Sequence, residues 1–196
     1  MTQIKNIIQV NGNTYKLWVT EKQIHNEIAK MAKWIDNRFA VVEQPPILME
    51  VQTGGKYFFV DLHRKLSIDV HVDAIGITSY PEIEKQTLPR ITSLPRSNIN
   101  NRDIILVEDI IDSGTTTDFI KRTFLVWGAK SVTIIALVAR QKTNGAMGFY
   151  DQVCFVYKGN EWLHGYGMDD AQLGRQLTSI YHLSRRVQVK ANKIPA

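Results

Sequence analysis

The segment IILVEDIIDSGTTT, residues 104–117, contains three carboxylates within five consecutive residues. Glu108 and Asp109 follow an aliphatic run, and Asp112 precedes a serine, a glycine and three threonines. In a turn of this composition, backbone N–H groups converge on an anion, glycine permits positive φ, and a following helix N-terminus adds partial positive charge. The segment therefore predicts a phosphate-binding turn. It lacks the lysine of the nucleotide-triphosphate loop G-x-x-x-x-G-K-[ST].

The acidic pair in this segment must do a different job, because carboxylates repel phosphate. Glu108 and Asp109 should face hydroxyl groups, which donate strong hydrogen bonds to carboxylates, or a magnesium ion bound directly or through water. An anion at the turn and a ribose diol at the acids together describe a sugar phosphate.

The elements around this segment indicate an α/β fold. Residues 104–107 read as a buried strand, and a helix over about 115–127 ends at Gly128, a plausible left-handed cap. Ligands bind at the carboxyl ends of strands in open parallel sheets, which is where the acids fall. The remaining expected elements are a helix over 21–38 capped by Thr20 and Gln23, a helical face in 56–66, strands at 47–51, 70–77, 131–138 and 153–157, loops at 78–102 and 141–151, and a turn or short helix at 170–177.

Composition limits the class of protein. The 196 residues are 44% hydrophobic and 22% charged, which is typical of one globular domain, and the apolar runs are too short to span a bilayer. The N-terminus lacks a signal peptide pattern, and the single Cys154 excludes an internal disulfide, so we expect a cytoplasmic protein. The net charge of +5 permits nucleic-acid binding. The basic C-terminal cluster (Arg185, Arg186, Lys190, Lys193) is interpreted as a solvated tail.

The motif ILVEDIIDSGTT resembles the phosphoribosyl pyrophosphate (PRPP) motif of type I phosphoribosyltransferases, most closely the hypoxanthine-guanine branch. Four further blocks resemble that family in the same order: LWVTEKQIHNEIAKMAKWI, VQTGGKYFFVDL, ITSY and GYGMDDAQLGRQL. The resemblance implies a mainly parallel twisted sheet flanked by helices, a small hood formed by the terminal segments, and a mobile lid at about 78–102. It implies a single domain over residues 1–196.

The resemblance also implies roles for the opening segment. Glu108 and Asp109 would hold the ribose hydroxyls and, with Asp169, a magnesium ion. Asp112 would lie near N7 of the base as a general acid or base, although an aspartate at a helix entry is also a common cap. The turn for the 5′-phosphate would comprise Asp112, Ser113, Gly114, Thr115 and Thr116.

The other blocks supply the rest of the implied site. The pyrophosphate loop would be Thr53, Gly54 and Gly55, assisted by Arg175, and the lid would carry Ser79 and Tyr80. Trp162 would stack on the purine, and Leu163 would contact it through its backbone. Four of the implied site residues also have an ordinary alternative role: a loop aromatic for Tyr80, a core or surface tryptophan for Trp162, a solvated acid for Asp169 and a helix-face charge for Arg175.

The sequence departs from the family pattern at two places. Thr53 stands where the family commonly has lysine. The family's purine-recognition lysine, aligned on ALVAR, falls at Ala139, so Ala139 and Arg140 are expected at the base. Arg140 or Lys142 could replace the missing donor, or the register could shift; otherwise discrimination for 6-oxopurines should weaken. His164 could also face the base, although a lone histidine is more often structural.

These features predict transfer of 5-phosphoribosyl from PRPP to a purine base, hypoxanthine or guanine first, with release of pyrophosphate. Mg²⁺ is the expected cofactor, and a homodimer or homotetramer without membrane or nucleic-acid partners is the expected assembly. Two alternatives stay open: the same reaction on xanthine, adenine or an unusual base, and a PRPP- or nucleotide-sensing regulator that binds RNA or DNA.

Overall fold

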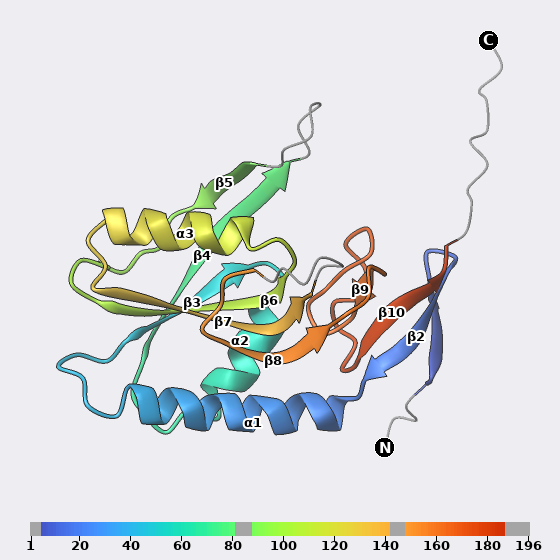
Figure 1. Ribbon diagram of the computed structural model, residues 1–196, viewed down its shortest axis with the longest axis horizontal. Coiled ribbons are helices and arrows are strands. Elements are labelled where there is room, and N and C mark those ends of the chain that lie inside the picture. Colours follow the sequence, from blue (N-terminus) through green and yellow to red (C-terminus); the bar gives the residue numbers. More distant parts are fainter. Residues whose placement is uncertain (1–4, 81–87, 142–147, 187–196) are drawn as a thin grey trace, which may run out of the picture.

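The computed structural model describes residues 5–80, 88–141 and 148–186 (Figure 1). Its larger sheet has the strand order β5-β4-β3-β6-β7-β8, in which only β5 runs antiparallel to its neighbour. The strands are β3 (Ile47–Gln52), β4 (His71–Tyr80), β5 (Leu88–Ser93), β6 (Asp103–Ile111), β7 (Ser131–Arg140) and β8 (Gln152–Tyr157). The predicted α/β fold with a mainly parallel sheet is confirmed.

Helices cover both faces of this sheet, so its central strands are buried on both sides. Helix α3 (Thr115–Val126) lies on one face, and α1 (Glu21–Arg38) and α2 (Lys56–His63) lie on the other (Figure 1). This arrangement explains the continuous aliphatic runs of β6 and β7, because alternate residues pack into two separate clusters.

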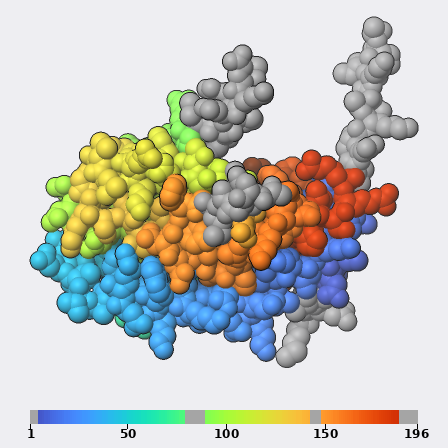
Figure 2. Space-filling view, viewed as in Figure 1, coloured from blue at the N-terminus to red at the C-terminus, as the bar shows by residue number. Residues whose placement is uncertain are grey.

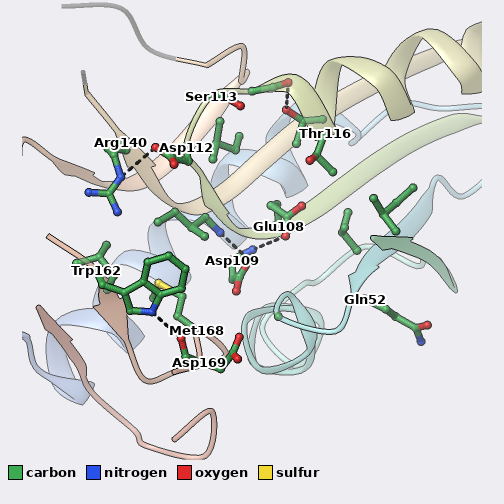
Figure 3. A pocket seen from close by; sticks show the side chains of 18 of the residues that line it. Gln52, Glu108, Asp109, Asp112, Ser113, Thr116, Arg140, Trp162, Met168 and Asp169 are labelled. Carbon is green, nitrogen blue, oxygen red and sulfur yellow. Dashed lines mark hydrogen bonds and ion pairs between the residues drawn. The ribbon is translucent and has the colours of Figure 1, made fainter. Parts of the chain in front are cut away.

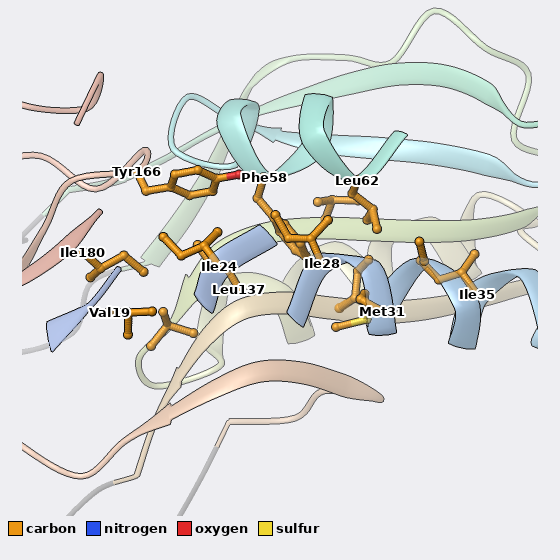
Figure 4. Close-up of a cluster of buried hydrophobic side chains, with 14 of the residues drawn as sticks. Val19, Ile24, Ile28, Met31, Ile35, Phe58, Leu62, Leu137, Tyr166 and Ile180 are labelled. Carbon is orange, nitrogen blue, oxygen red and sulfur yellow. The ribbon is translucent and has the colours of Figure 1, made fainter. Parts of the chain in front are cut away.

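Helix α1 forms where the sequence predicts it. Thr20 and Gln23 make the reciprocal capping box, which satisfies backbone N–H groups at the helix start. The helix then buries one apolar stripe against the sheet. Figure 4 shows side chains of this stripe packed with α2 and β7 in one cluster: Ile24, Ile28, Met31 and Ile35 of α1, Phe58 and Leu62 of α2, and Leu137 of β7.

A second, antiparallel sheet forms the hood. Its order is β1-β2-β10-β9, from β1 (Ile7–Val10), β2 (Asn13–Val19), β10 (Ile180–Arg185) and β9 (Leu163–His164). The N-terminal and C-terminal segments therefore lie side by side, as the adjoining blue and red surfaces at one end of Figure 2 show.

The sequence analysis named none of the hood strands, although one of them carries a signal. Asn11 and Gly12 join β1 to β2 with φ of 50° and 76°. An Asn-Gly pair with positive φ at both residues is the preferred two-residue hairpin turn.

The structure corrects several predicted boundaries. Strand β6 does not end at residue 107; it pairs with β7 as far as Ile111, so Glu108 and Asp109 lie inside the sheet. Part of the segment 78–102 is not a loop, because β4 continues to Tyr80 and pairs with β5. Helix α2 ends at His63, short of residue 66. Two other predictions are confirmed: residues 170–177 contain turns, and Gly128 has the left-handed conformation with φ of 91°.

Candidate active site

A cavity of about 450 Å³ opens at the carboxyl ends of the parallel strands. Figure 3 shows its walls: the end of β3, the acids of β6 and the turn that follows them, Arg140 at the end of β7, and the segment around β9 from the hood side. Its lining includes twelve of the predicted site residues: Gly54, Glu108, Asp109, Asp112, Ser113, Gly114, Thr116, Arg140, Trp162, Leu163, Asp169 and Arg175.

The acidic pair lies on the cavity floor with little exposure. Glu108 is 8% and Asp109 is 7% exposed, and the Glu108 Oε1 accepts a hydrogen bond from the Asp109 N–H at 3.2 Å. Burial, with the neighbouring negative charge, raises the pKa of Glu108 well above its ordinary value, and burial also raises the pKa of Asp109. Hydroxyl donors or a cation at this floor would relieve the cost of burying two adjacent acids.

The turn after β6 has the geometry of an anion site. Gly114 has φ of 79° and is the N-cap of α3, so the cap residue offers no side-chain hydrogen bond. Ser113 Oγ accepts from the N–H of Thr115 at 3.3 Å. A helix N-terminus after such a turn suits an anion, because it carries partial positive charge. A Cβ at Gly114 would lie 2.8 Å from Gly148 Cα, so a larger residue does not fit there. The alternative that Asp112 caps the helix is wrong, and Thr115 does not line the cavity.

Arg140 reaches the cavity from the end of β7. Its Nε lies 3.0 Å from Asp112 Oδ1. Its Nη1 donates to the carbonyl oxygens of Gly159 and Glu161 at 2.7 and 3.1 Å. The guanidinium carbon also stands 5.4 Å from the centre of the Tyr157 ring. These contacts fix the position of a positively charged group at the cavity wall.

Ala139 does not line the cavity and is fully buried in the sheet. Successive side chains on a strand point to opposite faces, so an alignment shifted by one residue exchanges a core position for a cavity position. The structure therefore brings Arg140 to the predicted base site and leaves Ala139 in the core. The other nearby cation, Lys142, lies outside the described residues.

The opposite wall of the cavity comes from the segment that contains β9 and the residues on either side of it. Trp162 is 52% exposed, and its indole N–H donates to the carbonyl oxygen of Asp169 at 2.7 Å. Figure 3 shows the indole across the cavity from Arg140, with Met168 beside it. Met168 was missed by the sequence analysis, although it stands next to Asp169 in a quoted motif.

His164 does not face the cavity. It is fully buried in the hood and stacks on Tyr15 with ring centres 4.7 Å apart. The structural role that is more common for a lone histidine is therefore confirmed, and the alternative that His164 faces the base is wrong.

Asp169 and Arg175 stand together at the entrance. Arg175 Nη2 lies 2.6 Å from Asp169 Oδ1, and the N–H of Gln172 donates to Asp169 Oδ2 at 2.7 Å. Arg175 is thus held near the acidic floor, and its positive charge opposes the rise in the pKa of Asp109. A cation at this place suits a pyrophosphate group.

The loop after β3 contributes mainly backbone to the cavity. The peptide bond between Gln52 and Thr53 is cis, and Gly54 lines the cavity against the Asp109 carboxylate. Thr53 is exposed and Gly55 is buried against strand carbonyls, and neither lines the cavity. The side chains of Ser79 and Tyr80 lie outside the described part of the molecule.

The residues present suit a magnesium ion that takes only a few of its ligands from the protein. Within residues 5–80, 88–141 and 148–186, no three Asp, Glu, His or Cys side chains gather as a metal cage. Magnesium commonly takes one or two protein carboxylates and completes its shell with water and substrate phosphates. Asp169 and the acidic pair match that limited donor set.

The comparisons with known proteins agree with this geometry. The model of the phosphoribosyl transferase domain matches residues 20–171. The chain belongs to the phosphoribosyl transferase domain family. In the described residues of this member, no helix is long and apolar enough to cross a membrane.

Individual relatives of this phosphoribosyl transferase domain are distant but cover most of it. A hypoxanthine-guanine phosphoribosyltransferase of Mycobacterium tuberculosis is 26% identical over 185 residues, 90% of this chain and 89% of the relative. One from Mycoplasma genitalium is 29% identical over 153 residues, 77% of this chain and 85% of the relative. A hypoxanthine-guanine phosphoribosyltransferase structure from Bacillus anthracis superposes with a TM-score of 0.74 at 27% identity, covering 86% of this chain and 96% of that one.

Proposed function

We propose that this protein transfers the 5-phosphoribosyl group of PRPP to a nitrogen of a purine base and releases pyrophosphate. One observation carries the proposal: a single cavity combines a buried acidic pair, a helix N-terminus that follows a glycine turn, and a wall with an aromatic ring and a cation. These suit the ribose diol, the 5′-phosphate and the base, respectively. The relatives named above as hypoxanthine-guanine phosphoribosyltransferases support the same reaction.

The chain's own residues divide the work as follows. Glu108 and Asp109 accept hydrogen bonds from the ribose hydroxyls, and the turn from Asp112 to Thr116 binds the 5′-phosphate. Gly54 and Arg175 bind pyrophosphate, and the guanidinium stabilises the charge that develops on this leaving group. Asp112, which is exposed to the cavity, exchanges a proton with the base.

Arg140 favours a base with an acceptor oxygen. A guanidinium has only donors, so it can satisfy the 6-oxo group of hypoxanthine or guanine and cannot accept from the 6-amino group of adenine. A buried donor left without an acceptor weakens binding sharply. We therefore propose hypoxanthine and guanine as substrates ahead of adenine, with Trp162 stacked on the ring.

The remaining features of the proposal are the conditions in which the reaction takes place. Asp169 and the acidic pair would hold Mg²⁺, which would neutralise charge on the pyrophosphate group. We also propose a cytoplasmic homo-oligomer with one domain over residues 1–196, and closure of a lid near Ser79 and Tyr80 that excludes water from the reacting centre.

The decisive experiment supplies PRPP and Mg²⁺ with hypoxanthine, guanine, xanthine or adenine, and measures pyrophosphate release and the nucleotide formed. We expect turnover with hypoxanthine or guanine and little with adenine. Turnover with adenine alone would contradict the role given to Arg140. Turnover with xanthine alone would keep that role, because xanthine also has a 6-oxo group, and would contradict the choice of hypoxanthine and guanine. No product from any base would contradict the proposed transfer, and RNA or DNA binding with a steep salt dependence would then indicate a regulator.

A further inference from the structure

Two segments on the pyrophosphate side of the cavity come from distant parts of the chain and touch through their backbones. Gly54 precedes α2, whereas Gly167 follows β9. A Cβ at Gly167 would lie 2.2 Å from the carbonyl oxygen of Gly54, so only glycine permits this approach. The Gly167 carbonyl oxygen also accepts from Arg175 Nη1 at 2.6 Å. The placement of Arg175 relative to Gly54 therefore depends on this contact.

One side-chain hydrogen bond joins the elements that carry these two glycines. The hydroxyl of Tyr166, next to Gly167, donates to Asp61 Oδ2 at 2.5 Å. Asp61 lies in α2, the helix that begins directly after the loop containing Gly54. Burial and the bond to Asp61 raise the pKa of Tyr166, so the hydroxyl keeps its proton and remains a donor.

The environment of Tyr166 makes this bond important for the position of the segment. The side chain is 4% exposed and packs into the cluster beneath the sheet (Figure 4). Its own N–H donates to the Leu177 carbonyl oxygen at 2.8 Å. A buried hydroxyl that loses its acceptor is costly, so the Asp61 contact restricts where Tyr166, and with it Gly167, can lie.

We propose that the Asp61–Tyr166 hydrogen bond is a positioning contact that holds Gly54 and Arg175 at the spacing required for pyrophosphate binding. Neither side chain lines the cavity, so both act through the backbones that they hold. The inference deepens the proposed function and rests on it, because it assigns the pyrophosphate part of PRPP to this end of the cavity. It makes a separable claim: the bond serves PRPP and pyrophosphate and leaves the base site unaffected.

The test compares four variants with the wild type. Tyr166→Phe removes the donor, Asp61→Leu removes the acceptor, and Asp61→Asn keeps an acceptor oxygen. Tyr57→Phe is the matched control. Tyr57 lies in α2, as Asp61 does, and its ring centre is 6.4 Å from that of Tyr166. No hydrogen bond of the Tyr57 hydroxyl is found in the described part of the chain. Each is assayed for kcat, KM for PRPP, KM for the base, and Kd for inorganic pyrophosphate with Mg²⁺ by calorimetry.

We expect Tyr166→Phe and Asp61→Leu to raise KM for PRPP and Kd for pyrophosphate about tenfold, as loss of one buried hydrogen bond predicts. KM for the base should stay unchanged, and Asp61→Asn and Tyr57→Phe should resemble the wild type. Equal increases in both KM values, or unchanged pyrophosphate binding in a folded Tyr166→Phe, would overturn the inference. If Tyr166→Phe fails to fold, the Asp61→Asn and Asp61→Leu pair gives the same comparison.

Pyrophosphate binding separates this inference from the proposed function. A wild type that binds pyrophosphate but makes no nucleotide contradicts the transfer reaction, and the Kd comparison among variants still decides the positioning role. A wild type that makes nucleotide while all four variants bind pyrophosphate equally contradicts only the positioning role. Absence of pyrophosphate binding in the wild type overturns the inference directly.

Discussion

The Arg140 guanidinium links the turn after β6 to the segment that precedes β9, with its Nε 3.0 Å from Asp112 Oδ1. The same group donates to the carbonyl oxygens of Gly159 and Glu161. One side chain therefore contacts the proposed proton-transfer carboxylate and the wall that is proposed to face the base. Substitution of Arg140 or of Asp112 should therefore disturb the position of the other side chain, and the two substitutions should change different kinetic constants.

Arg140→Met should weaken binding of oxopurines. It removes the donors proposed for the 6-oxo group while keeping a long apolar chain, so KM for hypoxanthine or guanine should rise about 10- to 100-fold. The measurement is KM for the base at saturating PRPP. Arg122→Met is the control, because Arg122 is 77% exposed on α3 and pairs only with Asp118 among the described ion pairs. An unchanged KM in Arg140→Met would refute base recognition by Arg140.

Asp112→Asn should lower kcat strongly and change the thermal stability of the protein little. It removes the group proposed to exchange a proton with the base, which is typically worth about 10²- to 10⁴-fold in rate. The carboxylate is 66% exposed, so thermal unfolding should change little. Steady-state kinetics and a melting curve test this, with Asp118→Asn in the same helix region as control. Full activity in Asp112→Asn would exclude Asp112 as the acid or base.

Trp162→Ala should raise KM for the base about tenfold, because stacking of a nucleobase on an aromatic ring is worth about 1–3 kcal/mol. Trp162→Phe should retain part of the effect. Trp127→Ala is the control, since Trp127 is also partly exposed, at 40%, but ends α3 outside the cavity lining. Quenching of tryptophan fluorescence by the base should be lost in Trp162→Ala and kept in Trp127→Ala. Quenching that persists in Trp162→Ala would place the base elsewhere.

Glu50→Gln should stabilise the protein at neutral and higher pH. Glu50 is 8% exposed in β3, its Oε1 has no hydrogen-bond partner among the described residues, and burial raises its pKa. The wild type ionises this buried acid above its raised pKa, which lowers stability there; below the pKa of the unfolded chain, the acid is protonated in both states.

The gain in free energy of unfolding for Glu50→Gln should be about 1 kcal/mol at pH 8 and should vanish near pH 4. Urea unfolding at several pH values measures it. Glu43→Gln, at an exposed site before β3, is the control. A gain of equal size at both pH values would show that ionisation of Glu50 is not the cause.

The sequence by itself determined the local features of this protein. The Asp-Ser-Gly-Thr-Thr turn, the Thr20–Gln23 capping box and the left-handed Gly128 depend on neighbouring residues, whose conformational preferences are short-range. The aliphatic runs of β6 and β7 predicted a sheet covered on both faces, since strands buried on both sides need no polar alternation. The hairpin at Asn11 and Gly12 was equally local, and it was missed although its signal was present.

Only the tertiary structure decided which distant residues meet and which way each side chain points. Arg140, rather than Ala139, reaches the cavity because the register of β7 against β6 selects one face, and a shift of one residue inverts that choice. His164 enters the hood core because β9 pairs with β10. Tyr166 meets Asp61 across 105 residues of chain, through packing that no local pattern encodes. Long-range contacts depend on how whole elements pack, so chemistry shared between segments is settled only in the folded molecule.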